Sequence, residues 1–163
     1  MLSTTTAMRQ RSRRSALVLG IMVAGVLLAT RAEAAPSCTV STTAVNFGAY
    51  NVFNASPTDS TGTLTYNCSG NAQNLVITLS KGSSTTFNPR TMSNGTDTMS
   101  YNLYRNAARS IICGDGTGGS QSYQPANPTN GRDYVRTIYG RIPAGQDVSA
   151  GAYTDTITAI VNY

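Results

Sequence analysis

The chain has 163 residues, with 12 lysines and arginines against seven aspartates and glutamates, a formal net charge of +5. It contains no histidine, the commonest general base and metal ligand of proteins. The basic excess lies at the N-terminus, at Arg9, Arg11, Arg13, Arg14 and Arg31. The region 35–163 keeps seven basic and six acidic residues, and its net charge of about +1 is too small to drive binding to nucleic acid or to a membrane.

The first 34 residues have the order of a secretory signal peptide. Arginines at 9–14 precede an apolar run at 16–29 and a small-x-small pattern at Ala32-Glu33-Ala34. The run has 14 residues, whereas about 20 are needed to cross a bilayer. We therefore expect cleavage after Ala34, export through the periplasm to the cell surface, no membrane span after cleavage, and one domain at 35–163.

The sequence contains three cysteines. In an oxidising compartment Cys38 and Cys68 can form a disulfide. Cys113 is then left over, and it has two interpretations. We favour a buried small hydrophobic residue, because free cysteine is often buried. The alternative is a thiol for an intermolecular bridge.

Strand-like segments alternate with turn signals through the first half of the exported region. Strands are expected at 38–48, 63–68, 74–80 and 87–92. In the first three, one face carries an apolar set: Val45 and Phe47; Leu64, Tyr66 and Cys68; Leu75, Ile77 and Leu79. Pro89 suits an edge strand, because proline cannot donate a ladder hydrogen bond.

The second half continues the β pattern. Strands are expected at 99–105, 134–142 and 152–163, with a short apolar piece at 110–113 and a long loop at 114–133. Their shared faces are Met99, Tyr101 and Leu103; Val135, Thr137 and Tyr139; and Tyr153, Ile157, Ala159, Val161 and Tyr163. About seven short strands separated by turns are typical of a β-sandwich.

Catalytic chemistry has little support in this region. Its acids are six aspartates, all but Asp155 in or beside expected turns, where capping is their usual role. The glycine-rich stretch 114–119 lacks the Lys-Ser/Thr ending of a phosphate loop. We expect no catalytic, metal or cofactor site, and a protein that is not an enzyme.

An ordered set of short motifs resembles the spore coat protein U / secreted pilin family. The set spans the region 35–163: Cys38-Thr39-Val40, Phe47-Gly48, Tyr66-Asn67-Cys68, Leu103-Tyr104, Gly114 to Gly119, Tyr139 to Pro143, Gly145-Gln146, and Gly151-x-Tyr153-x-Asp155-x-Ile157 up to Tyr163. Cys113 departs from the pattern, because the family often has tryptophan before Gly-Asp-Gly.

The resemblance implies an all-β, immunoglobulin-like sandwich that lacks its final strand. A periplasmic chaperone, and later another pilin or coat subunit, would lend a strand to the open groove, and an outer-membrane usher would export the subunit. One wall of this groove would be Tyr153, Ile157, Ala159, Val161 and Tyr163, and the other Val45 and Phe47. The alternative fold is a complete small sandwich with another strand order.

The expected strand at 152–163 leaves no residue to form a closing strand, as an acceptor of a strand requires. Only Ala35-Pro36-Ser37 precede Cys38 after the expected cleavage. Since a donor strand needs about ten alternating residues at ~3.3 Å each, we expect a subunit that accepts a strand without giving one.

Three functions follow, in order of preference. The first is a structural subunit of a secreted bacterial surface fibre, or of a spore or cell coat, that serves adhesion or biofilm formation. The second is a tip-adhesin-type binding module that contacts sugars or surfaces through the loop 114–133. The third, a secreted enzyme, is disfavoured by the missing histidine and the turn-bound aspartates.

Overall fold

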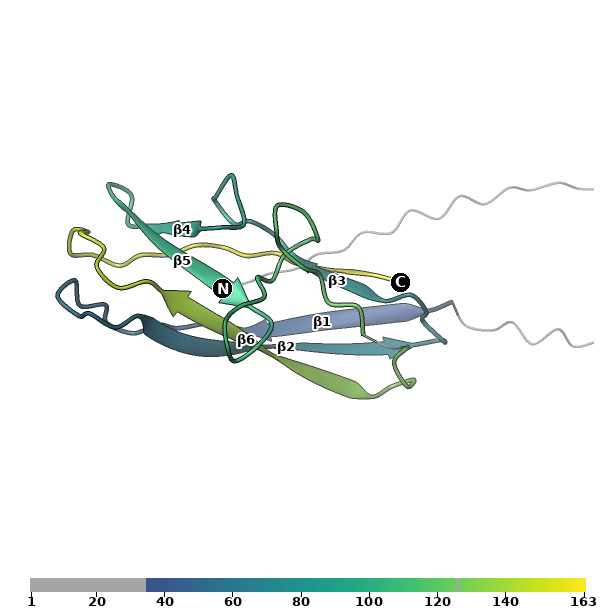
Figure 1. Cartoon of the computed structure of the whole chain (residues 1–163). Coiled ribbons are helices and arrows are strands. Elements are labelled where there is room, and N and C mark those ends of the chain that lie inside the picture. The colour runs from purple at the N-terminus through teal and green to yellow at the C-terminus, as the bar shows by residue number, and fades with distance from the viewer. Residues whose placement is uncertain (1–34, 126) are drawn as a thin grey trace, which may run out of the picture.

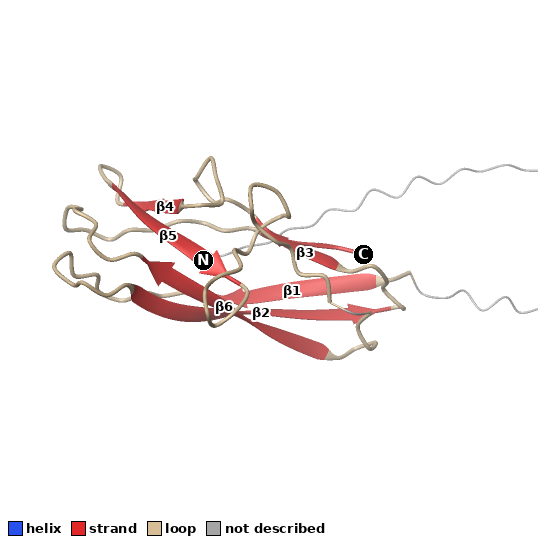
Figure 2. Ribbon diagram, in the orientation of Figure 1, coloured by secondary structure: helices blue, strands red, loops and turns tan. Residues whose placement is uncertain are grey.

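A computed structural model describes residues 35–125 and 127–163, and the expected signal peptide lies outside the described residues. The regular structure of the described residues is entirely β, as Figure 2 shows. The strands are β1 (Ser37–Thr43), β2 (Thr58–Ser69), β3 (Val76–Leu79), β4 (Arg90–Ser93), β5 (Thr98–Tyr104), β6 (Asp133–Ile142) and β7 (Ala159–Asn162). Within the described ranges, no helix is long and apolar enough to cross a bilayer.

The strands form two antiparallel sheets. One has the order β1-β2-β6-β5-β4, and the other pairs β3 with β7. The second sheet lies over the first, and the C-terminal segment runs along the length of the molecule (Figure 1). Buried residues from both sheets form one core cluster. The expected immunoglobulin-like β-sandwich is confirmed.

Alternation places the predicted apolar faces in the core. Leu64, Tyr66 and Cys68 of β2 are buried, while the residues between them are half-buried. The predicted sets Leu75, Ile77 and Leu79, and Met99, Tyr101 and Leu103, are also buried. The strand that follows Pro89, β4, lies at an edge of the larger sheet, as the proline predicts.

Several strand boundaries differ from the prediction. The largest differences are that β1 ends at Thr43 rather than residue 48, that β2 begins at Thr58 rather than residue 63, and that the last strand covers only Ala159–Asn162. The sequence pattern of residues 44–48 and 152–158 is strand-like, but a strand also requires a backbone partner. The piece at 110–113 is likewise no strand and makes single bridges only.

The shared face predicted for β6, Val135, Thr137 and Tyr139, lies opposite the core-facing side of the strand. Val135 and Thr137 are exposed, and the buried residues are Ile138, Gly140 and Ile142. Alternation alone does not show which face of β6 is buried, because the buried Gly140 adds no apolar side chain to the pattern.

The predicted disulfide is confirmed. Cys38 and Cys68 lie opposite each other in the β1–β2 ladder, and their Cα atoms are 4.1 Å apart. The bond therefore links neighbouring strands of one sheet and pins the edge strand β1 to the central part of the sheet.

A fully buried arginine, missed in the sequence, joins the two sheets. Arg90 in β4 donates to the carbonyls of Ser80 and Cys113 and to Asn102 Oδ1, with donor–acceptor distances of 2.7–3.2 Å. Its guanidinium lies over the Phe87 ring, 5.0 Å from the centroid. Burial lowers the pKa of Arg90, but such a group stays charged, so carbonyl acceptors must replace its hydration.

The interpretation of Cys113 as a buried small residue is confirmed, because its side chain has no exposed surface. Burial raises the pKa of the thiol to about 11. The segment after it folds back: Gly114 N–H donates to the Gln121 carbonyl, and Ser120, Ser122 and Tyr123 are buried.

Removing the disulfide with Cys38→Ser and Cys68→Ser together should lower the free energy of unfolding by about 3–4 kcal/mol. The physical reason is loop closure in the unfolded chain over a sequence separation of 30 residues. Urea denaturation of oxidised wild type and the double variant measures the difference. Treating the double variant with reductant should change nothing further, and a loss below about 1 kcal/mol would contradict the entropic account.

The Cys113 thiol should resist modification in the native protein. At pH 8 a thiol reagent should label no cysteine until denaturant is added, and should then label one. Because the folded pKa of about 11 lies above the ordinary 9.0, this group stabilises the fold fully below pH 9 and loses that contribution as pH rises toward 11. Cys113→Ala should flatten this part of the pH dependence, and rapid native labelling would contradict the burial.

Candidate functional site

An apolar groove with a volume of about 1190 Å³ lies between the two sheets. We call it the apolar groove. Its floor consists of core residues from five strands: Leu64, Leu79, Met92, Met99, Tyr101, Leu103, Ile138 and Ile142. Its two flanks are the segments 42–52 and 148–157, which lie near opposite ends of the described part of the chain.

Five of the seven predicted groove residues meet here. Val45 and Phe47 lie on one flank, and Tyr153, Ile157 and Ala159 line the other side. Val161 and Tyr163 do not line the groove. Val161 belongs to β7, where it pairs with Ile77, and Tyr163 lies beyond the end of β7 with 36% of its surface exposed.

The first flank packs directly against two glycines, Gly62 of β2 and Gly140 of β6. A Cβ on Gly140 would lie 2.5 Å from Val45 Cγ1 and 2.7 Å from Phe47 Cζ, and one on Gly62 would lie 2.9 Å from Val45 Cγ2. Real side chains essentially never approach this closely. Glycine at both positions therefore lets the flank lie directly on β2 and β6.

Side chains rather than a ladder hold the first flank. The Ser60 hydroxyl donates to the Asn46 carbonyl, and the Tyr50 hydroxyl donates to the Pro143 carbonyl. Phe47 makes an edge contact with Tyr101, with ring centroids 6.1 Å apart. Residues 44–50 make no backbone–backbone hydrogen bond within the described ranges.

The second flank is anchored by Asp155. Its carboxylate accepts from the Tyr101 hydroxyl at 2.6 Å and from the Ser83 N–H at 2.9 Å. Gly82 is required beneath it, since a Cβ there would collide with the carboxylate and φ is +68°. Burial, with the Asp155 carboxylate, raises the pKa of Tyr101 well above its usual range. The carboxylate therefore has a positioning role.

The flank backbones do not pair with each other. The second flank exchanges two hydrogen bonds between Thr154 and Ser93, and no backbone hydrogen bond joins residues 42–52 to residues 148–157. The groove thus combines an apolar floor with two extended flanks that have unused backbone donors and acceptors. Chemically, it suits an extended apolar segment better than a reaction centre.

Several groove residues escaped the sequence analysis. Tyr50, Val52 and Val148 line the flanks, although they lie outside every expected strand. The partial signal was their apolar character, which a freely solvated connection does not need. The described residues contain no group of three or more side chains able to hold a metal ion.

The loop 114–133 differs from the contact surface proposed for the binding alternative. Its tyrosine, Tyr123, is buried and exchanges two backbone hydrogen bonds with Ile77. The turn capping predicted for the aspartates is confirmed here, since Asp115 accepts from both the N–H and the hydroxyl of Thr117. The Tyr123 side chain therefore packs in the core, whereas Gln121 and Gln124 of the same loop are exposed.

Comparison with known sequences agrees with these features. The sequence model of the Spore Coat Protein U domain family matches residues 24–160. The chain belongs to this family. Protein U of Myxococcus xanthus is 33% identical over 132 residues, which cover 73% of this chain and 71% of the relative. The family match begins inside the expected signal peptide.

Comparison with solved structures supports the fold. A chain of the CsuC–CsuE chaperone–tip adhesion subunit pre-assembly complex, from the archaic chaperone–usher Csu pili of Acinetobacter baumannii, is similar with a TM-score of 0.56 and 23% identity. The match covers 79% of the present chain and 40% of that chain. The family member described here therefore spans less than half of this structural neighbour.

Gly140→Ala should destabilise the first flank. The added methyl group would press on Val45 and Phe47, and overpacking of this kind costs about 1–3 kcal/mol. Chemical denaturation measures the loss, and Thr137→Ala, at an exposed position on the same strand, should cost less than about 1 kcal/mol. Equal stability of the Gly140 variant and wild type would mean that the flank does not rest on this glycine.

Proposed function

We propose that this protein is a non-enzymatic structural subunit of a secreted bacterial surface fibre or coat, assembled by strand complementation. The observation that carries the proposal is the apolar groove, whose two flanks do not pair with each other. A strand laid between them would gain backbone hydrogen bonds on both sides and would cover the floor with every second side chain.

The energetic reason is the exposure of an apolar floor beside unpaired backbone. Such edges promote aggregation unless another chain covers them. Membership of the Spore Coat Protein U family and a fold shared with a chaperone–usher pilus complex support a periplasmic chaperone as the first occupant. An outer-membrane usher and another pilin or coat subunit would then complete export and assembly. Adhesion or biofilm formation is the role we propose for the product.

Ile157→Asp tests the groove directly. Ile157 is half-buried and lines the groove, so a carboxylate there would have to be desolvated beside the incoming strand. We expect recovery of the protein with its chaperone to fall at least tenfold in a pull-down from periplasmic extract. Ile160→Asp is the matched control, because Ile160 in β7 is 50% exposed and lies outside the groove.

The Ile160 variant should be recovered with the chaperone as well as wild type is, which shows that the loss is specific to the groove. Both variants should keep the Cys38–Cys68 disulfide as evidence of folding. Equal recovery of the Ile157 variant would contradict the proposal. A second readout is the surface fraction of the native cells, analysed on SDS gels with and without boiling. Species larger than the monomer that collapse on boiling are expected, whereas a monomer in both lanes would oppose strand complementation.

A further inference from the structure

A second, polar groove is lined in part by the loop that closes the sandwich, and no residue lines both grooves. Its volume is about 520 Å³. It is bordered by the turn after β5, by the loop segment 121–125 and by the first half of β6. We call it the arginine groove, after its two cationic residues, Arg105 and Arg136.

Arg105 is held in place at the wall of this groove. One of its terminal nitrogens donates to Gln121 Oε1 at 3.1 Å, and its guanidinium stacks over the Tyr123 ring at 4.7 Å from the centroid. A guanidinium has five N–H donors, so most remain free for a ligand. Preorganisation of this kind reduces the entropy lost on binding.

Arg136 borders the same groove from β6, and its side chain is exposed. Both guanidinium groups act on the buried Tyr123 hydroxyl: burial raises the pKa of Tyr123, and Arg105 and Arg136 oppose that rise. Two positive charges thus converge on one place. Within the described residues, neither arginine forms a salt bridge, since both ion pairs there use Asp59.

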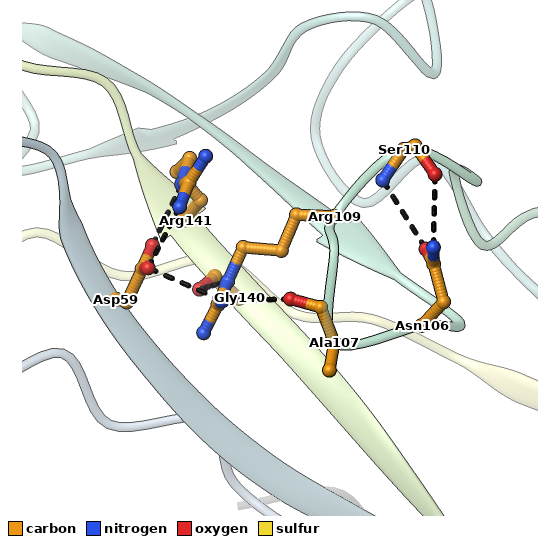
Figure 3. Close-up of polar contacts among 7 residues, drawn as sticks. All are labelled: Asp59, Asn106, Ala107, Arg109, Ser110, Gly140 and Arg141. Atoms are coloured by element: carbon orange, nitrogen blue, oxygen red, sulfur yellow. Dashed lines mark hydrogen bonds and ion pairs between the residues drawn. The ribbon is translucent and has the colours of Figure 1, made fainter.

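The turn that carries Arg105 is braced by that aspartate. Asp59 accepts from Arg141 at 2.7 Å and forms an ion pair with Arg109 at 3.2 Å (Figure 3). Arg109 also donates to the Gly140 carbonyl, and the Asn106 side chain bonds Ser110, as the dashed lines in the figure show. Arg109 and Arg141 therefore share one carboxylate, whereas Arg105 and Arg136 have no carboxylate partner among the described residues.

The remaining lining is of the kind that binds hydroxyl groups. Gln124 has an exposed amide with no hydrogen-bond partner among the described residues, and Gln121 uses only its carbonyl oxygen. Tyr139 contributes an aromatic wall. A few convergent polar groups beside an aromatic surface are typical of small-ligand sites, and arginine forks recognise carboxylates in particular.

From this convergence we propose that the arginine groove binds a carboxylate-bearing saccharide. Arg105 and Arg136 would bind the carboxylate, and the side chains of Gln121 and Gln124 would form hydrogen bonds with sugar hydroxyls. The site is independent of strand complementation, because it shares no lining residue with the apolar groove. It places the sugar contact on β6, on the turn after β5 and on two glutamines of the loop 114–133, rather than on the buried Tyr123.

The test is isothermal titration of the exported full-length gene product, in its assembled or chaperone-bound form, with an oligogalacturonate and with the neutral galactose oligomer of equal length. Binding of the acidic oligomer at least tenfold tighter is expected, because hydrogen bonds between charged groups are the stronger class. Arg105→Gln and Arg136→Gln should each weaken it about tenfold. Arg105→Lys should restore part of the loss, since it keeps the charge.

Arg132→Gln is the matched control, because Arg132 is exposed near the start of β6 but lies outside the groove. It should change the affinity less than twofold. An equal loss in this control would mean attraction by net charge alone and would overturn the proposal. So would equal binding of the neutral oligomer, binding of poly-glutamate in place of the saccharide, or no binding at all. Unchanged melting curves of the variants show that the fold is intact.

Discussion

The structure depends on one buried cation. Arg90 replaces its lost water with two backbone carbonyls and one amide oxygen, which come from the end of β3, from Cys113 and from β5. An unsatisfied guanidinium at this place would cost several kcal/mol. The segments that supply its acceptors therefore have to meet at that point, which ties the small sheet to the large one and draws the chain after β5 back onto the core.

One part of the sandwich is therefore closed by contacts between the two sheets, whereas the part that holds the apolar groove is open. Arg90, the folded loop around Tyr123 and the β3–β7 pairing close one part of the sandwich. Along the apolar groove the flanks are held by side-chain contacts, such as Asp155 with Tyr101, and by one backbone bridge between Thr154 and Ser93. A sandwich built in this way keeps its shape while one long slot in it remains available to another strand. The proposed assembly uses that slot, and the arginine groove lies outside it.

Much of the fold followed from alternation, and the errors have a common cause. The apolar sets of β2, β3 and β5 were predicted correctly, because burial of one face leaves a period of two in the sequence. Residues 44–48 and 152–158 show the same period, but they are not paired as strands, because pairing depends on a neighbour that alternation does not reveal. Alternation did not reveal the buried face of β6, since Gly140 is buried for the room that it leaves to Val45 and Phe47 rather than for apolar area.

The sequence by itself determined the class of the fold, the disulfide partners, the family and five of the residues that line the apolar groove. Each of these is encoded locally, in a repeating pattern, a cysteine pair or a short motif. Only the tertiary structure decided that Val161 and Tyr163 lie elsewhere, that Tyr123 is buried and that Arg105 and Arg136 border one groove. Those facts depend on which distant segments meet, and in a β-sandwich contacts of this kind join residues far apart in the chain, where no local pattern records them.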